Sequence, residues 1–141
     1  ASVRETFVVV DDDPAFRRWA EAALLAAYPK ANVQACHSGS AALKILERTR
    51  VRALISDLDM PKMNGMELTN TVRERWPKVP IVVATGVGGA GDWKILRDLG
   101  ADEIVLKPMR MDGLSSAVAR AIRAVERGED QLSPGLREVS A

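Results

Sequence analysis

The stretch Ala53-Leu54-Ile55-Ser56-Asp57-Leu58-Asp59-Met60-Pro61 places a carboxylate at the end of a short apolar run. A continuous run of this kind, followed by a loop that contains proline and then Asn64-Gly65, is typical of a strand that is buried on both faces. The sequence therefore predicts a strand over residues 53–56 that delivers Asp57 to the loop at its carboxyl end.

Segments of the same kind recur along the chain and alternate with segments of helical periodicity. This alternation predicts an α/β fold, a doubly wound parallel sheet with helices on both of its faces. Strands are predicted over residues 7–10, 32–36, 53–56, 81–84 and 103–106, and helices over 14–27, 39–46, 66–76, 93–99 and 111–125.

The composition is that of one globular domain of ordinary size. The chain has 141 residues, of which 47% are hydrophobic, and a net charge of +1. A sizeable core is therefore expected, without a strong attraction to nucleic acid or to a membrane surface. The longest apolar runs reach roughly five residues, whereas a helix that spans a bilayer needs about 20. The charge pair Arg4-Glu5 near the start predicts that no signal peptide is present.

The only cysteine and the only histidine are adjacent, at Cys36 and His37. A single cysteine excludes an internal disulfide and suits a reducing compartment, so a cytoplasmic protein is expected. Because a zinc site needs three or four ligands, and His37 has no partner at metal-ligand spacing, we expect it to be a surface residue.

Functional side chains follow four of the five predicted strands. Asp11 and Asp12 follow the first, Asp57 the third, Thr85 the fourth and Lys107 the fifth. In an open parallel sheet these strand ends share one edge, where ligands bind. Clustered carboxylates repel one another unless a cation neutralises them, and Mg²⁺ prefers carboxylate and water oxygens. The pattern predicts an aspartate that accepts a phosphoryl group, while a metal, a lysine and a hydroxyl offset the charge.

Each of these residues taken alone also has a structural explanation. Aspartates are common in the turns that follow strands. Asp13 with Pro14 is expected to cap the first helix, and Phe16 to lie on the inward face of that helix. The combination of acids, hydroxyl and lysine at four strand ends is what favours a functional site.

Four motifs, in the same order and at the same spacing, resemble those of the receiver domain of two-component response regulators. They are Val9-Val10-Asp11-Asp12-Asp13-Pro14, Ser56-Asp57-Leu58-Asp59-Met60-Pro61 with Asn64-Gly65, Ala84-Thr85-Gly86, and Leu106-Lys107-Pro108. The resemblance covers roughly residues 5–127, and it implies a flavodoxin-like fold of five strands in the order 2-1-3-4-5. We expect residues 1–127 to form a receiver domain and the polar residues 128–141 to be a tail or a truncated linker.

The resemblance implies that Asp57 accepts phosphate from a histidine kinase or a histidine phosphotransfer protein. Asp12, Asp57 and the backbone carbonyl of Asp59 would bind Mg²⁺, and Asp11 would contribute through a water molecule. Lys107 would pair with the phosphate. These roles are expectations that follow from membership in such a family.

The resemblance also implies a switching mechanism. Thr85 would be the hydroxyl that moves toward the phosphate, and the bond between Lys107 and Pro108 is often cis in this family. The sequence departs from the family at Ile104, where Tyr or Phe is often found. Because isoleucine has no ring to rotate, we expect the glycine-rich loop 86–91 and the helix after it to carry the signal.

The expected function is a phosphorylation-dependent switch, not an enzyme that turns over a substrate. The output surface would lie on the fourth helix, the fifth strand and the last helix. The expected partners are the phosphate donor and a downstream domain or protein of unknown kind, with homodimer formation as an open alternative. Direct binding to nucleic acid or to a membrane is not expected.

Three other interpretations are open on the sequence alone. Asp57-Leu58-Asp59 has the D-x-D form of haloacid-dehalogenase-like phosphatases, which would use Asp57 as the nucleophile, but Pro61 replaces their usual Thr or Val. The run Gly86-Val87-Gly88-Gly89-Ala90-Gly91 has dinucleotide-binding spacing, but the next strand ends in Lys107 and not in an acid. An interaction module that is never phosphorylated would not need the acids, the threonine or the lysine.

Overall fold

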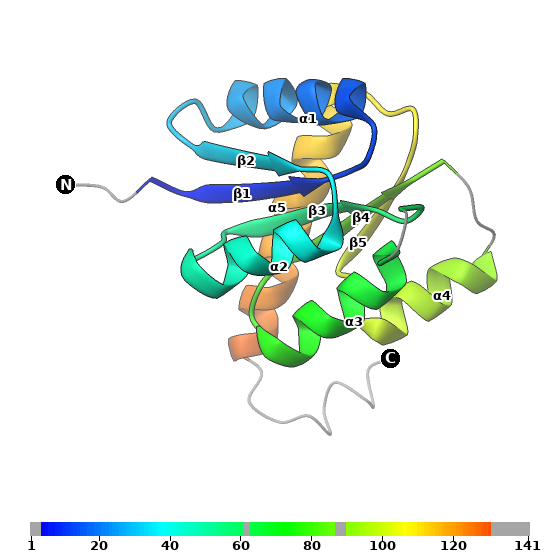
Figure 1. The fold of residues 1–141 in the computed structure, drawn as a ribbon. Helices are drawn as coiled ribbons and strands as arrows, with labels where there is room; N and C mark the ends of the chain where they lie inside the picture. Colours follow the sequence, from blue (N-terminus) through cyan, green and yellow to red (C-terminus); the bar gives the residue numbers. More distant parts are fainter. Residues whose placement is uncertain (1–3, 61–62, 87–89, 131–141) are drawn as a thin grey trace.

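The computed structural model describes residues 4–60, 63–86 and 90–130, with the backbone alone at 90–92 and 129–130. Strands and helices alternate throughout (Figure 1). The strands are β1 (Thr6–Val10), β2 (Asn32–Cys36), β3 (Ala53–Asp57), β4 (Ile81–Thr85) and β5 (Glu103–Leu106). The helices are α1 (Pro14–Ala27), α2 (Gly39–Arg48), α3 (Gly65–Arg75), α4 (Ala90–Leu99) and α5 (Met111–Asp130).

The strands form one parallel sheet in the order β2-β1-β3-β4-β5. Helices α1 and α5 cover one face, and α2, α3 and α4 cover the other (Figure 1). The predicted α/β class, the layers and the flavodoxin-like strand order are confirmed. Because all strands run in the same direction, their carboxyl ends meet at one edge of the sheet.

Burial explains why the middle strands could be recognised. Every residue of β1, β3 and β4 is buried, in agreement with their continuous apolar sequences. The edge strands β2 and β5 are partly exposed. Two core layers flank the sheet. The layer under α1 and α5 contains Phe7, Leu24, Ile55 and Leu114, and the layer under the other helices contains Leu54, Leu68, Ile81 and Leu96.

Capping residues set the helix boundaries. The side chains of Asp13, Ser38 and Asn64 accept hydrogen bonds from backbone N–H groups in the first turns of α1, α2 and α3, at 2.9, 3.2 and 3.0 Å. Helix α3 begins at Gly65, one residue earlier than predicted, because Asn64 caps it. Helix α4 ends before Gly100, whose φ of 122° suits glycine alone.

Helix α5 continues through Asp130, past the domain boundary predicted at residue 127. The rest of the predicted tail, residues 131–141, lies outside the described residues. The division into a receiver domain and a tail therefore stays a prediction. Within the described part of the chain, no helix combines the length and the apolar content needed to cross a membrane.

Candidate functional site

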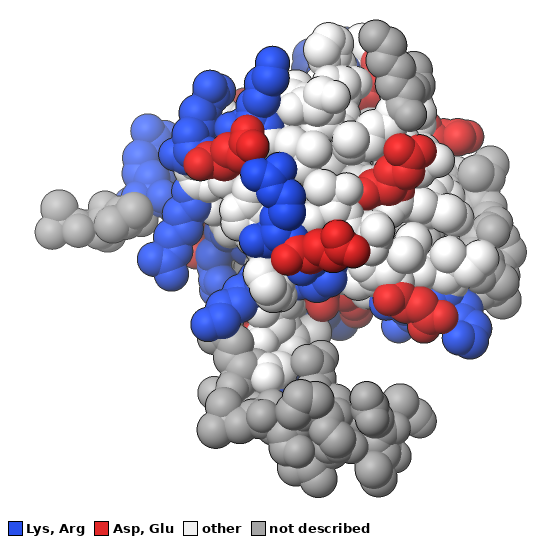
Figure 2. Space-filling model, turned by 60° about the horizontal axis from the view of Figure 1, so that its bottom comes forward, with Lys and Arg blue, Asp and Glu red and all other residues white. Residues whose placement is uncertain are grey.

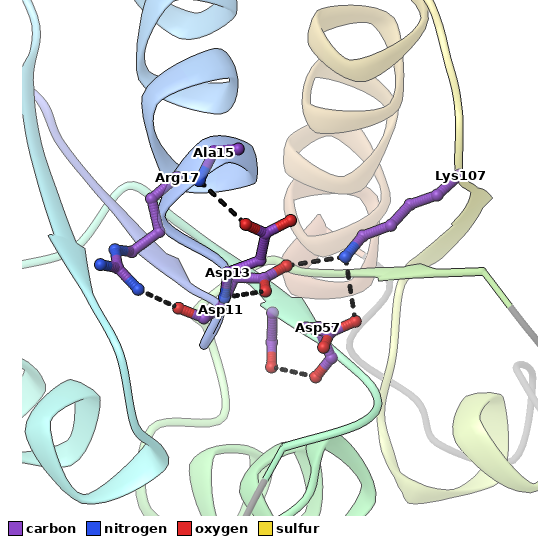
Figure 3. Close-up of polar contacts among 7 residues, drawn as sticks. Asp11, Asp13, Ala15, Arg17, Asp57 and Lys107 are labelled. Atoms are coloured by element: carbon purple, nitrogen blue, oxygen red, sulfur yellow. Dashed lines mark hydrogen bonds and ion pairs between the residues drawn. The ribbon is translucent and has the colours of Figure 1, made fainter.

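The carboxyl-terminal edge of the sheet brings side chains from several strands to one place. Asp11 follows β1, Asp57 ends β3, Thr85 ends β4 and Lys107 follows β5. Figure 3 shows Lys107 reaching across from the end of β5 toward Asp11 and Asp57. The prediction that distant strand ends bring their side chains together is confirmed for Asp11, Asp57 and Lys107, which are in direct contact.

Lys107 forms ion pairs with two buried carboxylates. Its Nζ atom lies 2.7 Å from Asp11 Oδ2 and 3.2 Å from Asp57 Oδ1. Asp11 is 1% exposed and Asp57 is 7% exposed, so these charges interact in surroundings that screen them less than water does. One ammonium balances one of the two carboxylate charges, and the three side chains together keep a negative charge.

Asp12 completes an acidic cluster with Asp11 and Asp57. Each of the three offers a carboxylate oxygen, and these oxygens lie within 4.8 Å of one another. Asp12 is exposed while the other two are buried, so the cluster is open to solvent on one side. Oxygen ligands with access to water are the donors that Mg²⁺ prefers. The donor set therefore fits this metal.

The pKa values of Asp57 and Lys107 are shifted by burial and by the charges that these side chains share with Asp11. Burial raises the pKa of Asp57 above its usual 3.8, and the charge of Asp11 raises it further, while Lys107 opposes both effects. Burial alone would lower the pKa of Lys107, but its hydrogen bond to Asp11 and the two carboxylate charges outweigh burial and raise that pKa above 10.5. The shared lysine is thus stabilised in its charged form, whereas the Asp57 carboxylate is not fully compensated.

Two contacts that sequence reasoning missed hold the loop after β1 in place. The backbone N–H of Asp13 donates to Asp11 Oδ1 at 2.8 Å, and Arg17 Nη1 donates to the Asp11 carbonyl oxygen at 2.7 Å (Figure 3). The first contact leaves Asp11 Oδ2 for Lys107. An aspartate at the end of a strand is a signal for this contact, because an aspartate side chain often accepts a hydrogen bond from the backbone N–H two residues on. The Arg17 contact depends on a side-chain conformation that the sequence pattern does not predict.

An aromatic contact of Lys107 was also missed. The ring centroid of Phe16, in the first turn of α1, lies 4.1 Å from Lys107 Nζ. This is within the range of a cation–π interaction. Sequence periodicity indicated only that Phe16 packs inward. Lys107 therefore contacts Asp11, Asp57 and Phe16, which lie on three different segments of the chain.

Thr85 and Asp59 are the two remaining predicted site residues, and they lie at the end of β4 and in the loop after β3. Thr85 is 1% exposed at the end of β4, and its carbonyl oxygen accepts a hydrogen bond from the Lys107 backbone N–H at 2.8 Å. Asp59 is exposed in the loop after β3, and its carboxylate does not belong to the acidic cluster. Only the backbone carbonyl of Asp59 was expected to take part.

The structure describes two of the three features expected of the switch, namely the bond between Lys107 and Pro108 and the position of Ile104. The bond between Lys107 and Pro108 is cis, as the resemblance suggested. Ile104 is buried and packs in the core layer under α2, α3 and α4. Of the predicted signalling loop 86–91, residues 87–89 lie outside the described residues, and the role of this loop stays a prediction.

Gly65 allows α3 to begin close to the backbone of the β3 strand end. Its N–H donates to the Leu58 carbonyl oxygen at 2.8 Å. A Cβ atom at position 65 would meet the Asp57 carbonyl oxygen and would lie 2.7 Å from the Leu58 Cα atom. Backbone atoms cannot move aside cheaply, so we expect Gly65→Ala to lower the free energy of unfolding by about 1–3 kcal/mol, as measured by urea denaturation.

Gly113→Ala is the matched control for Gly65→Ala. A Cβ at position 113, in α5, would have its nearest neighbour at 3.9 Å, which is an ordinary contact with Met109. This change should raise stability by up to about 1 kcal/mol, since alanine favours helix more than glycine does. If both variants were equally stable, the close approach at Gly65 would not be a constraint.

Comparison with known proteins identifies the family. Residues 7–119 match the response regulator receiver domain. The chain belongs to this family. Response regulator MprA of Mycobacterium ulcerans is 28% identical over 124 residues, which is 88% of this chain and 53% of that protein. Probable transcriptional regulator ycf27 of Porphyridium aerugineum is 29% identical over 125 residues, 88% of this chain and 50% of that protein. This receiver domain thus spans about half the length of these relatives.

Solved structures agree with the fold. The chemotaxis response regulator CheY4 of Vibrio cholerae has a TM-score of 0.76 and 25% sequence identity, covering 84% of this chain and 99% of that one. The CheY-like receiver domain protein from Methanospirillum hungatei has a TM-score of 0.80 and 20% identity, covering 89% and 99%. The family match supports a signalling domain of two-component systems, and it does not support the phosphatase interpretation.

Proposed function

We propose that this receiver domain is a phosphorylation-dependent switch, in which Asp57 accepts a phosphoryl group from a histidine kinase or a histidine phosphotransfer protein. The observation that carries the proposal is the position of the Asp57 carboxylate, 7% exposed at a strand end, beside Asp11, Asp12 and Lys107. A structural ion pair would not need this excess of acids. A site for a metal ion and a transferable phosphoryl group does need it.

Mg²⁺ is the proposed cofactor. Asp12 and Asp57 would hold it with carboxylate oxygens, Asp59 with its backbone carbonyl, and Asp11 through a water molecule. A bound Mg²⁺ ion would offset negative charge on the phosphoryl oxygens. The proposal is supported by the three carboxylate oxygens within 4.8 Å of one another and by the raised pKa of Asp57, which burial and then the charge of Asp11 cause.

In the proposed step, a carboxylate oxygen of Asp57 attacks the phosphorus atom of the donor phosphohistidine. The bond between phosphorus and nitrogen breaks, and its electron pair stays on the imidazole, which leaves neutral when its other nitrogen carries a proton. Lys107, which contacts Asp57 Oδ1 at 3.2 Å, would pair with one phosphoryl oxygen. The Thr85 hydroxyl would donate a hydrogen bond to another.

The signal would leave through the surface formed by α4, β5 and α5. A phosphoryl group adds a charge of about −1.5 to −2 at neutral pH, which would shift the equilibrium between two arrangements of the nearby loops. Ile95, Leu106 and Met111, one on each of these elements, are 47%, 52% and 39% exposed. Exposed apolar side chains on this surface support partner binding there, by an output domain or protein or by a second copy of the chain.

We further propose the division into a receiver domain (1–127) and a tail or linker (128–141). By the same proposal the domain works in the cytoplasm, binds neither nucleic acid nor membrane itself, and turns over no substrate. The single cysteine, Cys36, suits this compartment.

Labelling with acetyl [³²P]phosphate tests the proposed function. With Mg²⁺ present, we expect incorporation to approach one phosphoryl group per chain, and chelation with EDTA should slow labelling by about 100-fold or more, since Mg²⁺ offsets the transferred charge. Sustained multiple turnover of p-nitrophenyl phosphate would instead favour the phosphatase alternative. Absence of any labelling would contradict the proposal.

A further inference from the structure

We propose that Phe16 is a positioning residue, which holds the Lys107 ammonium beside Asp57 through the face of its aromatic ring. The inference rests on the proposed function, and it adds a residue of α1 to the phosphoryl-accepting site. The primary observation is the distance of 4.1 Å between Lys107 Nζ and the centroid of the Phe16 ring. At this distance the negative face of the ring attracts a cation.

The core fixes the position of the ring independently of the charged groups. Phe16 packs against the core layer under α1 and α5. Its ring also contacts that of Trp19, with centroids 5.5 Å apart and an angle of 37° between the planes. A ring supported from behind in this way loses little further freedom when it contacts a cation. Phe16 is therefore a rigid partner for the flexible side chain of Lys107.

The other two partners of Lys107 change during the proposed reaction. The Asp11 and Asp57 carboxylates contact Nζ at 2.7 and 3.2 Å, but both would share their charge with Mg²⁺, and Asp57 becomes an acyl phosphate. The ring of Phe16 carries no proton to lose and takes no part in bond making. Its attraction for the ammonium thus persists when the carboxylates are engaged elsewhere.

Without such a partner the lysine has an alternative position. The Lys107 side chain is 23% exposed, and a long lysine stem readily extends to place its ammonium in water. A metal ion on the carboxylates would favour that movement, because it repels the ammonium. Phe16 opposes the movement by holding Nζ on the Asp57 side of the site.

The test compares Phe16→Leu, which removes the ring, with Phe16→Tyr, which keeps it. We expect Phe16→Leu to slow labelling by acetyl phosphate about 3- to 10-fold, the range of a partly desolvated cation–π contact, and Phe16→Tyr to label at nearly the wild-type rate. The pKa of the Lys107 ammonium, followed by ¹³C-detected NMR of its Cε atom, should fall in Phe16→Leu, because the ring stabilises the charged form.

Two further variants separate positioning from general stability. Tyr28→Leu trims an aromatic residue that packs on the same core layer at the other end of α1, and it should leave the labelling rate unchanged. In a Lys107→Met background, Phe16→Leu should have no additional effect, because the two residues act as a unit. An additive effect there, or a wild-type rate and an unchanged lysine pKa in Phe16→Leu, would overturn the inference. Unlabelled wild-type protein would instead contradict the proposed function itself.

Discussion

Asp57→Asn is expected to abolish labelling by acetyl phosphate and to leave the fold intact. An amide oxygen is a poor nucleophile, and the neighbouring carboxylates Asp11 and Asp12 belong to a different strand end, so neither replaces it on the attack trajectory. The expected loss is at least about 100-fold, the scale of removing a group that acts as a unit with its neighbours. Incorporation of ³²P into the intact chain, followed by mass spectrometry of tryptic peptides, measures the loss and locates the label.

The same substitution should make the domain more stable above acidic pH. Because the pKa of Asp57 is raised in the folded state, the folded protein binds the proton more tightly than the unfolded chain. Wild-type stability therefore falls as pH rises from 3.8 through the folded-state pKa. Asparagine has no proton to lose. The free energy of unfolding of Asp57→Asn should therefore equal that of the wild type below pH 3.8, and its excess over the wild type should be complete above the folded-state pKa of Asp57. Urea denaturation at several pH values measures the difference.

Asp13→Asn is the matched control for Asp57→Asn. Asp13 caps α1, and asparagine caps a helix about as well as aspartate does. Its side chain lies outside the acidic cluster formed by Asp11, Asp12 and Asp57. We expect Asp13→Asn to label at the wild-type rate. Undiminished labelling of Asp57→Asn would show that another residue accepts the phosphoryl group.

The sequence was sufficient to predict the fold because the middle strands are buried on both faces. Continuous apolar runs such as residues 53–56 and 81–84 have few alternatives to a central parallel strand. Once the strands are parallel, their carboxyl ends share an edge, and the strand order that the family resemblance implied brings Lys107 near Asp57 on that edge. The acidic cluster was predictable for the same reason.

The contacts that escaped prediction depend on side-chain conformation. Phe16 has the sequence signature of a core residue, and nothing in periodicity shows that one face of its ring meets an ammonium. Arginine is usually exposed to solvent, yet the Arg17 guanidinium donates a hydrogen bond to the Asp11 carbonyl oxygen. The start of α3 was placed one residue late because Asn64-Gly65 also suits a turn. Such details follow from the packing of the three-dimensional structure.

Lys107→Met should destabilise the domain near neutral pH by about 2–4 kcal/mol when no divalent cation is present, the scale of removing one partner from a buried ion pair. Asp11 and Asp57, which are 1% and 7% exposed, would lose the Lys107 ammonium, with which each of them forms an ion pair. The pKa of Lys107 is raised above 10.5, so, while the two carboxylates stay ionised, its stabilising contribution is complete at pH values below 10.5 and is lost as pH rises through the folded-state pKa.

The conditions that restore the stability of Lys107→Met distinguish an electrostatic cause from a packing defect. Protonation of the two carboxylates at acidic pH, or binding of Mg²⁺ to them, should restore much of the stability of Lys107→Met, because either change removes the uncompensated charge. The variant should also bind Mg²⁺ more tightly than wild type, since the ammonium no longer competes for Asp11 and Asp57. Thermal unfolding across a Mg²⁺ titration measures both effects, with Lys44→Met, an exposed lysine of α2, as the control. Equal Mg²⁺ responses in the two variants would mean that Lys107 and the metal do not share the same carboxylates.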